Sequence, residues 1–230
     1  MNIEIYADGS SFSEMVSIYN AKKFVTGFTT NPSLMRKEKI DNYISFVEKV
    51  TRYIKDLPIS FEVFADDLSE MKRQAKILAG FGKNIFVKIP LNNTKGESTK
   101  TLIKSLLEDA IMVNITAVFT IEQIDELIPY LQGGPVILSI FAGRIADTGI
   151  DPKPIIKHGI NSVPSNVKIL WASPREIYNV YEADQIGCHI ITISQDILKK
   201  LELKNKNLTE YSLETVKMFY DDAKIAGYVL

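Results

Sequence analysis

A single lysine stands in an otherwise apolar segment of this sequence, in the run Phe86-Val87-Lys88-Ile89-Pro90. An ammonium group in such surroundings loses hydration, and this loss lowers its pKa and favours the neutral amine. A neutral amine can attack the carbonyl carbon of a substrate. The segment therefore makes Lys88 a candidate nucleophile. The alternative is a lysine whose chain lies along apolar surface while its ammonium group reaches solvent.

Two carboxylates occur in comparable apolar runs. Asp8 follows the run 3–7, and Glu62 lies within the run 59–64. Two carboxylates at one end of a fold can divide acid and base roles if their surroundings separate their pKa values. Asp8 and Glu62 are therefore candidates for proton transfer. The alternative is that each forms an ion pair with a neighbouring lysine or arginine.

Neutral hydrogen-bonding side chains interrupt or follow three further runs. They are Asn31, Asn114, Thr116 and Ser139. A polyhydroxylated substrate needs such groups to fix its hydroxyls, so these residues are candidates for sugar binding. They could instead bond to one another inside the fold.

A candidate anion site lies later in the chain, at Arg144, Ser173 and Arg175. Two guanidinium groups can offer paired donors to phosphate oxygens, and Ser173 precedes a predicted helix whose first turn contains Pro174. The alternative is a pair of ordinary solvated surface arginines.

The elements that must position these residues follow from hydropathy. Eight runs rich in β-branched and aliphatic residues are predicted strands: 3–7, 25–28, 59–64, 85–87, 112–118, 136–141, 167–171 and 190–193. Segments with helical spacing lie between them, for example Phe12, Met15, Val16 and Tyr19. This alternation predicts a parallel sheet, and eight units permit closure into a (β/α)8 TIM barrel. The active site of such a barrel lies at the C-terminal ends of its strands, so one shared site is expected.

Bulk composition narrows the class of protein. The chain has 230 residues, 46% of them hydrophobic, which fits one soluble domain over 1–230. Its 27 basic and 28 acidic residues give a net charge of -1, so bulk charge suggests neither a nucleic-acid nor a membrane partner. A single cysteine, Cys188, excludes an intrachain disulfide, and no Cys/His cluster has metal-ligand spacing. No secretory signal is visible, and no apolar run approaches the roughly 18 residues that span a bilayer. A cytoplasmic protein is expected.

A closed barrel does not account for the C-terminal residues, about 205–230. A further helix is expected over about 212–226, with apolar side chains at Leu213, Val216, Phe219 and Tyr220. These side chains need burial. The helix is therefore expected to contact another subunit, with folding back onto its own barrel as the alternative.

Five segments together resemble a known family. They are 27–35 (GFTTNPSLM), 87–90 (VKIP), 113–120 (VNITAVFT), 139–145 (SIFAGRI) and 172–175 (ASPR). In this order and spacing they resemble transaldolases and the related small fructose-6-phosphate aldolases. The resemblance covers most of the chain up to about residue 200.

The resemblance implies a role for each candidate residue. Lys88 would form a Schiff base with a ketose phosphate, and Asp8 would move the proton of the hydroxyl next to the breaking bond. Glu62 and Thr116 would hold the catalytic water. The substrate-binding set would comprise Thr30, Asn31, Asn114, Ser139 and Phe141, with the phosphate at Arg144, Ser173 and Arg175. The implied chemistry needs no metal or other cofactor. The resemblance also implies a homo-oligomer, a pentamer or a decamer.

Two residues favour one branch of this family. Glu62 and Phe141 resemble the transferase pattern, whereas the aldolases tend to carry glutamine and tyrosine there. We therefore expect a transaldolase of the pentose phosphate pathway. It would transfer a dihydroxyacetone unit from fructose 6-phosphate or sedoheptulose 7-phosphate to an aldose phosphate. A fructose-6-phosphate aldolase is the first alternative, and a non-catalytic sugar-phosphate-binding barrel is the second.

Three features depart from the family pattern: a bulky Phe28, a long loop over 91–96 after the lysine, and Trp171. The loop and Trp171 are expected to affect the size and shape of the substrate more than the covalent chemistry.

Overall fold

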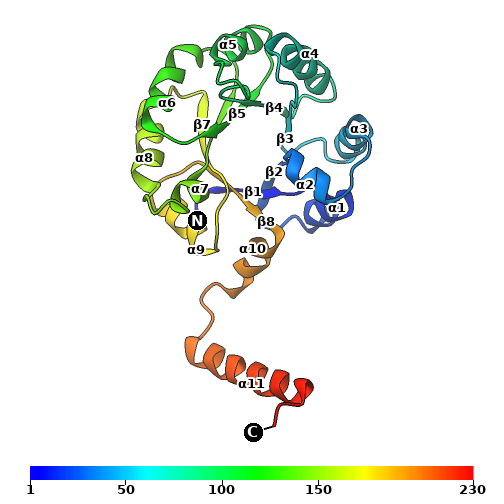
Figure 1. Cartoon of the computed structure of the whole chain (residues 1–230), viewed down its shortest axis with the longest axis vertical. Helices are drawn as coiled ribbons and strands as arrows, with labels where there is room; N and C mark the ends of the chain where they lie inside the picture. Colours follow the sequence, from blue (N-terminus) through cyan, green and yellow to red (C-terminus); the bar gives the residue numbers. More distant parts are fainter. Residues whose placement is uncertain (230) are drawn as a thin grey trace. The chain divides into compact units, whose positions relative to one another are not determined.

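The computed structural model describes residues 1–229, which contain a closed barrel of eight parallel strands in sequence order (Figure 1). Each expected run corresponds to one strand, and the fold class is confirmed. The largest differences are at the third strand, which ends at Glu62, and the fourth, which continues to Pro90. The strands are β1 (Glu4–Asp8), β2 (Val25–Thr29), β3 (Ile59–Glu62), β4 (Ile85–Pro90), β5 (Val113–Val118), β6 (Val136–Ile140), β7 (Val167–Trp171) and β8 (Ile190–Ser194).

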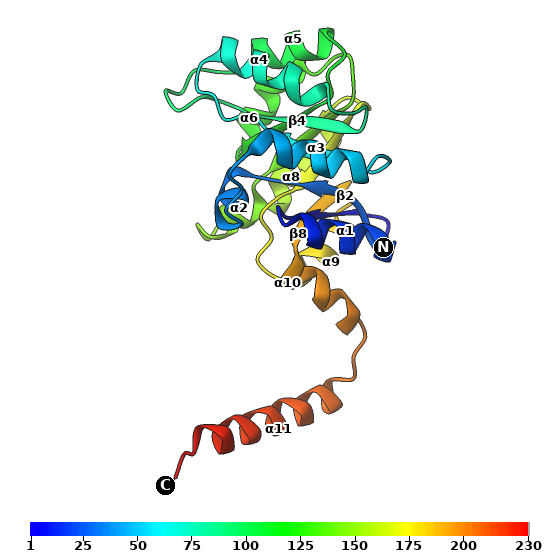
Figure 2. The same ribbon diagram turned by 90° about the vertical axis from the view of Figure 1, so that its right-hand side faces the viewer.

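The helices between the strands surround the barrel (Figures 1 and 2). Their apolar stripes pack on the outward-facing side chains of the strands, as the helical spacing predicts. The helices are α1 (Phe12–Ala21), α2 (Pro32–Lys37), α3 (Tyr43–Tyr53), α4 (Leu68–Ala79), α5 (Lys100–Glu108), α6 (Ile121–Leu127), α7 (Ala142–Ala146), α8 (Lys153–Ser162), α9 (Tyr178–Gln185), α10 (Gln195–Lys200) and α11 (Leu208–Ala226), with 3-10 turns η1 (Ile128–Tyr130) and η2 (Leu201–Leu203).

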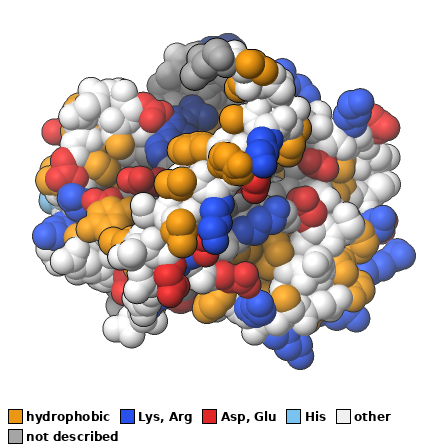
Figure 3. All heavy atoms as spheres, turned by 90° about the horizontal axis from the view of Figure 1, so that it is seen from below, with side chains coloured by type: hydrophobic (Ala, Val, Ile, Leu, Met, Phe, Trp, Pro, Cys, Tyr) orange, Lys and Arg blue, Asp and Glu red, His pale blue; other side chains and the backbone are white. Residues whose placement is uncertain are grey.

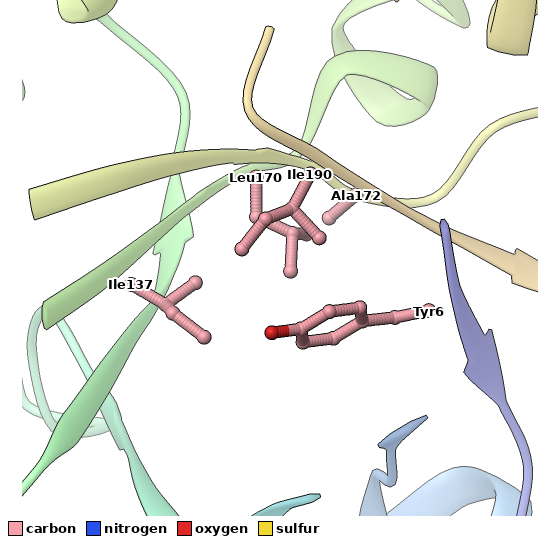
Figure 4. Packing of buried hydrophobic residues seen from close by; sticks show 5 residues of the cluster. All are labelled: Tyr6, Ile137, Leu170, Ala172 and Ile190. Carbon is pink, nitrogen blue, oxygen red and sulfur yellow. The ribbon is translucent and has the colours of Figure 1, made fainter. Parts of the chain in front are cut away.

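The barrel interior is filled by side chains rather than open. Figure 4 shows a cluster in which the ring of Tyr6 extends from β1 toward Ile137, with Leu170, Ile190 and Ala172 grouped above it in this view. The ring needs space that only glycine leaves, because a Cβ on Gly27 would lie 2.6 Å from it.

The chain divides into two compact units, Met1–Leu198 and Lys199–Leu230. In the second unit, α11 begins at Leu208, earlier than the sequence pattern indicates. Asn207 accounts for this start, because its side-chain oxygen accepts hydrogen bonds from the backbone of Thr209 and Glu210. Gly227 ends the helix in a left-handed conformation.

No side chain of α11 is buried. Its apolar residues Leu213, Val216, Phe219 and Tyr220 are each more than half exposed. Figure 3 shows one face of the molecule, on which exposed hydrophobic side chains lie among charged ones. Among the described helices, none is long and apolar enough to cross a membrane.

Candidate active site

A pocket of about 610 Å³ lies at the C-terminal ends of the strands. This volume is in the range of small-molecule sites. Most of the expected site residues line it, although they come from strands and loops far apart in the sequence. The lining residues are Asp8, Thr29, Asn31, Pro32, Ser33, Leu34, Lys37, Glu62, Lys88, Thr116, Ser139, Phe141, Arg144, Leu170, Ala172, Ser173 and Thr192.

Lys88 lies in the wall of this pocket and is 7% exposed. Glu62 is its register partner on β3, and the Glu62 Oε2 lies 2.9 Å from the Lys88 Nζ. The Nζ also donates a hydrogen bond of 2.9 Å to the backbone oxygen of Thr30. Two acceptors, one on β3 and one directly after β2, thus fix the position of the amine. A buried charge needs such partners, and a carboxylate beside the amine is also a proton acceptor.

Asp8 ends β1 at the same level. Its Oδ1 accepts a hydrogen bond of 2.9 Å from the Thr29 hydroxyl. Burial raises the pKa of Asp8, and the positive charge of Lys88 opposes only part of this effect. The carboxyl therefore keeps its proton to a higher pH than an exposed aspartate does. A raised pKa suits a group that both accepts and returns a proton during a reaction.

Thr116 lines the pocket with an unsatisfied hydroxyl. Its Oγ1 is buried and has no hydrogen-bond partner among the described residues. Buried hydroxyls are nearly always bonded, so this one is available to a water molecule or to a substrate.

The expected sugar-binding residues do not all reach the pocket. Asn31 and Ser139 line it. Asn114 is fully buried behind it, where its oxygen accepts from the Ser139 hydroxyl (2.7 Å) and its amide donates to Ser60 (2.9 Å). Thr30 is also buried, and its hydroxyl donates to the backbone oxygen of Ser60. Asn114 and Thr30 thus support Ser139 and Lys88 rather than line the pocket.

The three expected anion-binding residues are separated. Arg144 and Ser173 line the pocket. Ser173 follows Ala172 on the inward-facing side only because its backbone is left-handed, with φ of 61°. Arg175 instead lines a second cavity of about 400 Å³ and pairs there with Asp147. The second cavity is lined by Ala142, Gly143, Ala146, Gly149, Ile150, Asp151, Pro152, Trp171, Arg175, Glu176, Asn179 and Glu182.

The two bulky residues that depart from the family pattern lie outside the pocket. Phe28 lies between Gly27 and Thr29, which face the barrel interior, so it points outward and is fully buried. Trp171 is 2% exposed and lines the second cavity. Trp171 therefore does not line the substrate pocket, because alternation along β7 turns its ring toward the second cavity.

Sequence reasoning missed Lys37 and Ser33, which lie on α2 and line the pocket. Lys37 forms no ion pair within the described chain, so the pocket carries a further unpaired cation. The signal was present in the sequence, since Pro32 and the side chain of Asn31 start a helix directly after β2. Such a helix brings its next residues over the end of the barrel.

Among the described residues, no group of three or more histidine, cysteine, aspartate or glutamate side chains could hold a metal ion.

Comparison with known proteins decides which family this site represents. The family model described as transaldolase/fructose-6-phosphate aldolase matches residues 5–228. The chain belongs to this family. A probable transaldolase of Thermoanaerobacter sp. (strain X514) is 34% identical over 211 residues, covering 90% of this chain and 91% of that protein. A probable transaldolase of Nitrosopumilus maritimus is 32% identical over 227 residues, covering 96% of each.

A solved structure outside the family has a similar fold. It is the N-acetylmannosamine-6-phosphate 2-epimerase from Clostridium perfringens, with a TM-score of 0.58 at 10% identity over 88% of this chain and 91% of that one. At this identity the likeness concerns the barrel fold alone. In this member of the transaldolase/fructose-6-phosphate aldolase family, Asn31, Lys88, Thr116 and Arg144 line the pocket described above.

Proposed function

We propose that this protein is a transaldolase that acts through an imine on Lys88. It transfers a dihydroxyacetone unit from a ketose phosphate, such as fructose 6-phosphate or sedoheptulose 7-phosphate, to an aldose phosphate. The observation that carries the proposal is the buried Lys88 amine, 2.9 Å from the Glu62 carboxylate in a pocket that also contains Asp8. Membership of the transaldolase/fructose-6-phosphate aldolase family supports it.

The first step forms the imine. Glu62 accepts a proton from the Lys88 ammonium, and the neutral Nζ attacks the ketose carbonyl carbon. The resulting carbinolamine loses its hydroxyl as water and becomes a protonated imine. Thr116 and Glu62 hold this water, for which the unpartnered Thr116 hydroxyl offers a binding group. The same water later hydrolyses the imine.

The second step breaks a carbon–carbon bond. Asp8 takes the proton from the hydroxyl on the carbon beyond the breaking bond, and the electron pair of that bond moves into the protonated imine. An enamine remains on Lys88 and an aldose phosphate leaves. An incoming aldose phosphate then accepts the enamine carbon at its aldehyde, and Asp8 returns the proton to the new hydroxyl. Because burial raises the pKa of Asp8, proton transfer in both directions costs less than with an ordinary aspartate.

The remaining pocket residues bind the sugar. Asn31 and Ser139 contact hydroxyls of the three-carbon unit, with Ser139 fixed from behind by Asn114. Thr30 acts through its backbone oxygen, which holds the lysine. Arg144 and Ser173 bind the phosphate, together with Arg175 once it is released from Asp147.

Phe141 favours transfer over aldol cleavage. Its ring lines the pocket, packs 5.6 Å from that of Phe119, and lies under the Arg144 guanidinium at 5.4 Å. It offers no hydroxyl that could protonate the enamine, so the enamine lasts until an acceptor arrives. A fructose-6-phosphate aldolase is the second candidate, and a silent sugar-phosphate-binding barrel is the third.

Borohydride reduction in the presence of fructose 6-phosphate tests the proposal. The expected result is a stable adduct on the peptide that contains Lys88, found by mass spectrometry, and its absence in Lys88→Met. Lys83→Met, a change on the surface loop before β4, serves as control and should trap normally. An adduct that persists in Lys88→Met would refute the assignment. Absence of any adduct would favour the silent barrel.

The proposal includes a subunit contact. Residues 1–230 form one barrel domain whose extension from about 205 binds a neighbouring copy, in a pentamer or decamer. The support is the set of exposed apolar side chains on α11.

A further inference from the structure

Arg175 and Asp147 form a two-point ion pair. The Nε of Arg175 donates to Oδ1 of Asp147 over 2.9 Å, and its Nη2 donates to Oδ2. Both side chains are about half exposed, at 49% and 51%. One edge of the guanidinium, with two of its donors, is therefore occupied by a carboxylate of the protein itself.

The position of this pair matters because α7 lies between it and the pocket. Arg144 on α7 and Ser173 line the active-site pocket, whereas Gly143 and Arg175 line the second cavity. Arg175 lies across Gly143, since a Cβ there would be 3.4 Å from the Arg175 Nε and 1.5 Å from the backbone oxygen of Ser173. The space that a side chain at Gly143 would fill is occupied by the backbone oxygen of Ser173, so Ser173 and the Arg175 guanidinium lie against the same point of α7.

We propose that Asp147 competes with the phosphate group of the substrate for Arg175. In the free protein Asp147 holds the guanidinium outside the pocket. A sugar phosphomonoester bound to Arg144 and Ser173 then draws Arg175 away from Asp147. Asp147 touches no substrate, so it is a positioning residue that sets how strongly phosphorylated sugars are preferred. The inference rests on the proposed function.

The balance of charges gives the expected size of the effect. A phosphate dianion offers more charge than one carboxylate, so it can displace Asp147. A half-exposed ion pair contributes little free energy in water, so removing it should change phosphate affinity by about two- to fivefold. The affinity for an unphosphorylated sugar should not change, because Arg175 then has no ligand.

The test replaces Asp147 by asparagine in the full chain. In Asp147→Asn, KM for fructose 6-phosphate should fall about two- to fivefold. The kcat and the KM for unphosphorylated fructose should stay unchanged. Asp151→Asn is the matched control, because Asp151 lies in the same loop between α7 and α8 and contacts Lys153 rather than Arg175. In an Arg175→Ala background, Asp147→Asn should have no effect on KM. Asp147→Ala, which removes both acceptors, should act as Asp147→Asn does.

A second measurement is independent of turnover. Inorganic phosphate should raise the melting temperature of Asp147→Asn at a lower concentration than that of the unchanged protein. A KM for fructose 6-phosphate that does not fall, or a phosphate affinity that does not rise, in both Asp147 variants would overturn the inference. An effect that persists without Arg175 would also overturn it. Failure of borohydride trapping would refute the proposed function, whereas the phosphate titration would still report the competition.

Discussion

The Nζ of Lys88 lies 2.9 Å from Oε2 of Glu62, its register partner on the neighbouring strand. Parallel strands place partners side by side, so the pairing of β3 with β4 brings acid and amine together without any loop. Both side chains are largely buried, at 9% and 19% exposure, and a buried pair depends on each partner.

Glu62→Gln should keep the fold and lose proton transfer. The amide cannot take the lysine proton, so we expect transfer of the dihydroxyacetone unit to fall by about 10²–10⁴-fold, the usual contribution of an acid–base group. Glu70→Gln, at a partly exposed position on α4, is the control. Coupled-enzyme rates measure the effect, and near-normal turnover in Glu62→Gln would exclude Glu62 as the proton acceptor.

Asp8→Asn should stabilise the fold while it removes activity. The pKa of Asp8 in the folded chain lies above the ordinary 3.8, so the folded chain binds this proton more tightly than the unfolded chain. The stability of the unchanged protein therefore falls as pH rises from 3.8 through the folded-state pKa. The amide that Asp8→Asn introduces does not ionise, so the variant avoids this loss.

Urea denaturation between pH 3.5 and 8 measures this effect. The unfolding free energy of Asp8→Asn should exceed that of the unchanged protein at neutral pH and approach it in acid. Carbon–carbon cleavage should slow by about 10²–10⁴-fold. A variant that is less stable at pH 7 would show that the net environment favours the charged carboxylate.

Phe141→Tyr should shift the reaction toward aldol cleavage. The added hydroxyl lies where the ring lines the pocket and can help to protonate the enamine. Release of free dihydroxyacetone from fructose 6-phosphate, measured without an acceptor aldose, should increase relative to transfer. Phe119→Tyr is the control, because Phe119 packs on Phe141 but does not line the pocket. If the unchanged protein already releases dihydroxyacetone as fast as it transfers it, the aldolase alternative is correct.

Lys37→Met should weaken binding of phosphorylated substrates. Lys37 is an exposed cation at the edge of the pocket, so its effect is electrostatic and modest, about two- to fivefold in KM at low salt. The difference should vanish near 1 M salt, where charges are screened within about 3 Å. Arg36→Met removes a charge from the neighbouring residue, which does not line the pocket, and should change KM less. Equal effects of the two variants would mean that only net charge matters.

A chain that ends at Lys204 should lose its assembly. Sedimentation of the full chain should give an oligomer, since the apolar side chains of α11 have no cover within their own helix. The shortened chain should sediment as a monomer. As a control for packing, Phe219→Glu in the full chain should weaken assembly, whereas Asp221→Lys should change it less. A monomeric full-length protein would refute the proposed subunit contact.

The sequence by itself determined the barrel and the end of the barrel at which the candidate reactive residues lie. Strands and helices alternate with different hydrophobic periods, and eight strands suffice for closure, so the C-terminal strand ends had to meet. Lys88, Glu62 and Asp8 follow from this rule, because each belongs to a strand whose neighbours are known once the order is known.

The tertiary structure decided everything that depends on the direction of a side chain near a strand end. Trp171 points outward, whereas Ser173, two residues later, lines the pocket, and the backbone of Ser173 itself is left-handed. Arg175 pairs with Asp147, 28 residues away, whereas the Thr116 hydroxyl has no hydrogen-bond partner within residues 1–229. Hydropathy predicts which residues of the barrel are buried. Partners across the barrel follow only from the backbone angles and loop paths that the whole fold imposes.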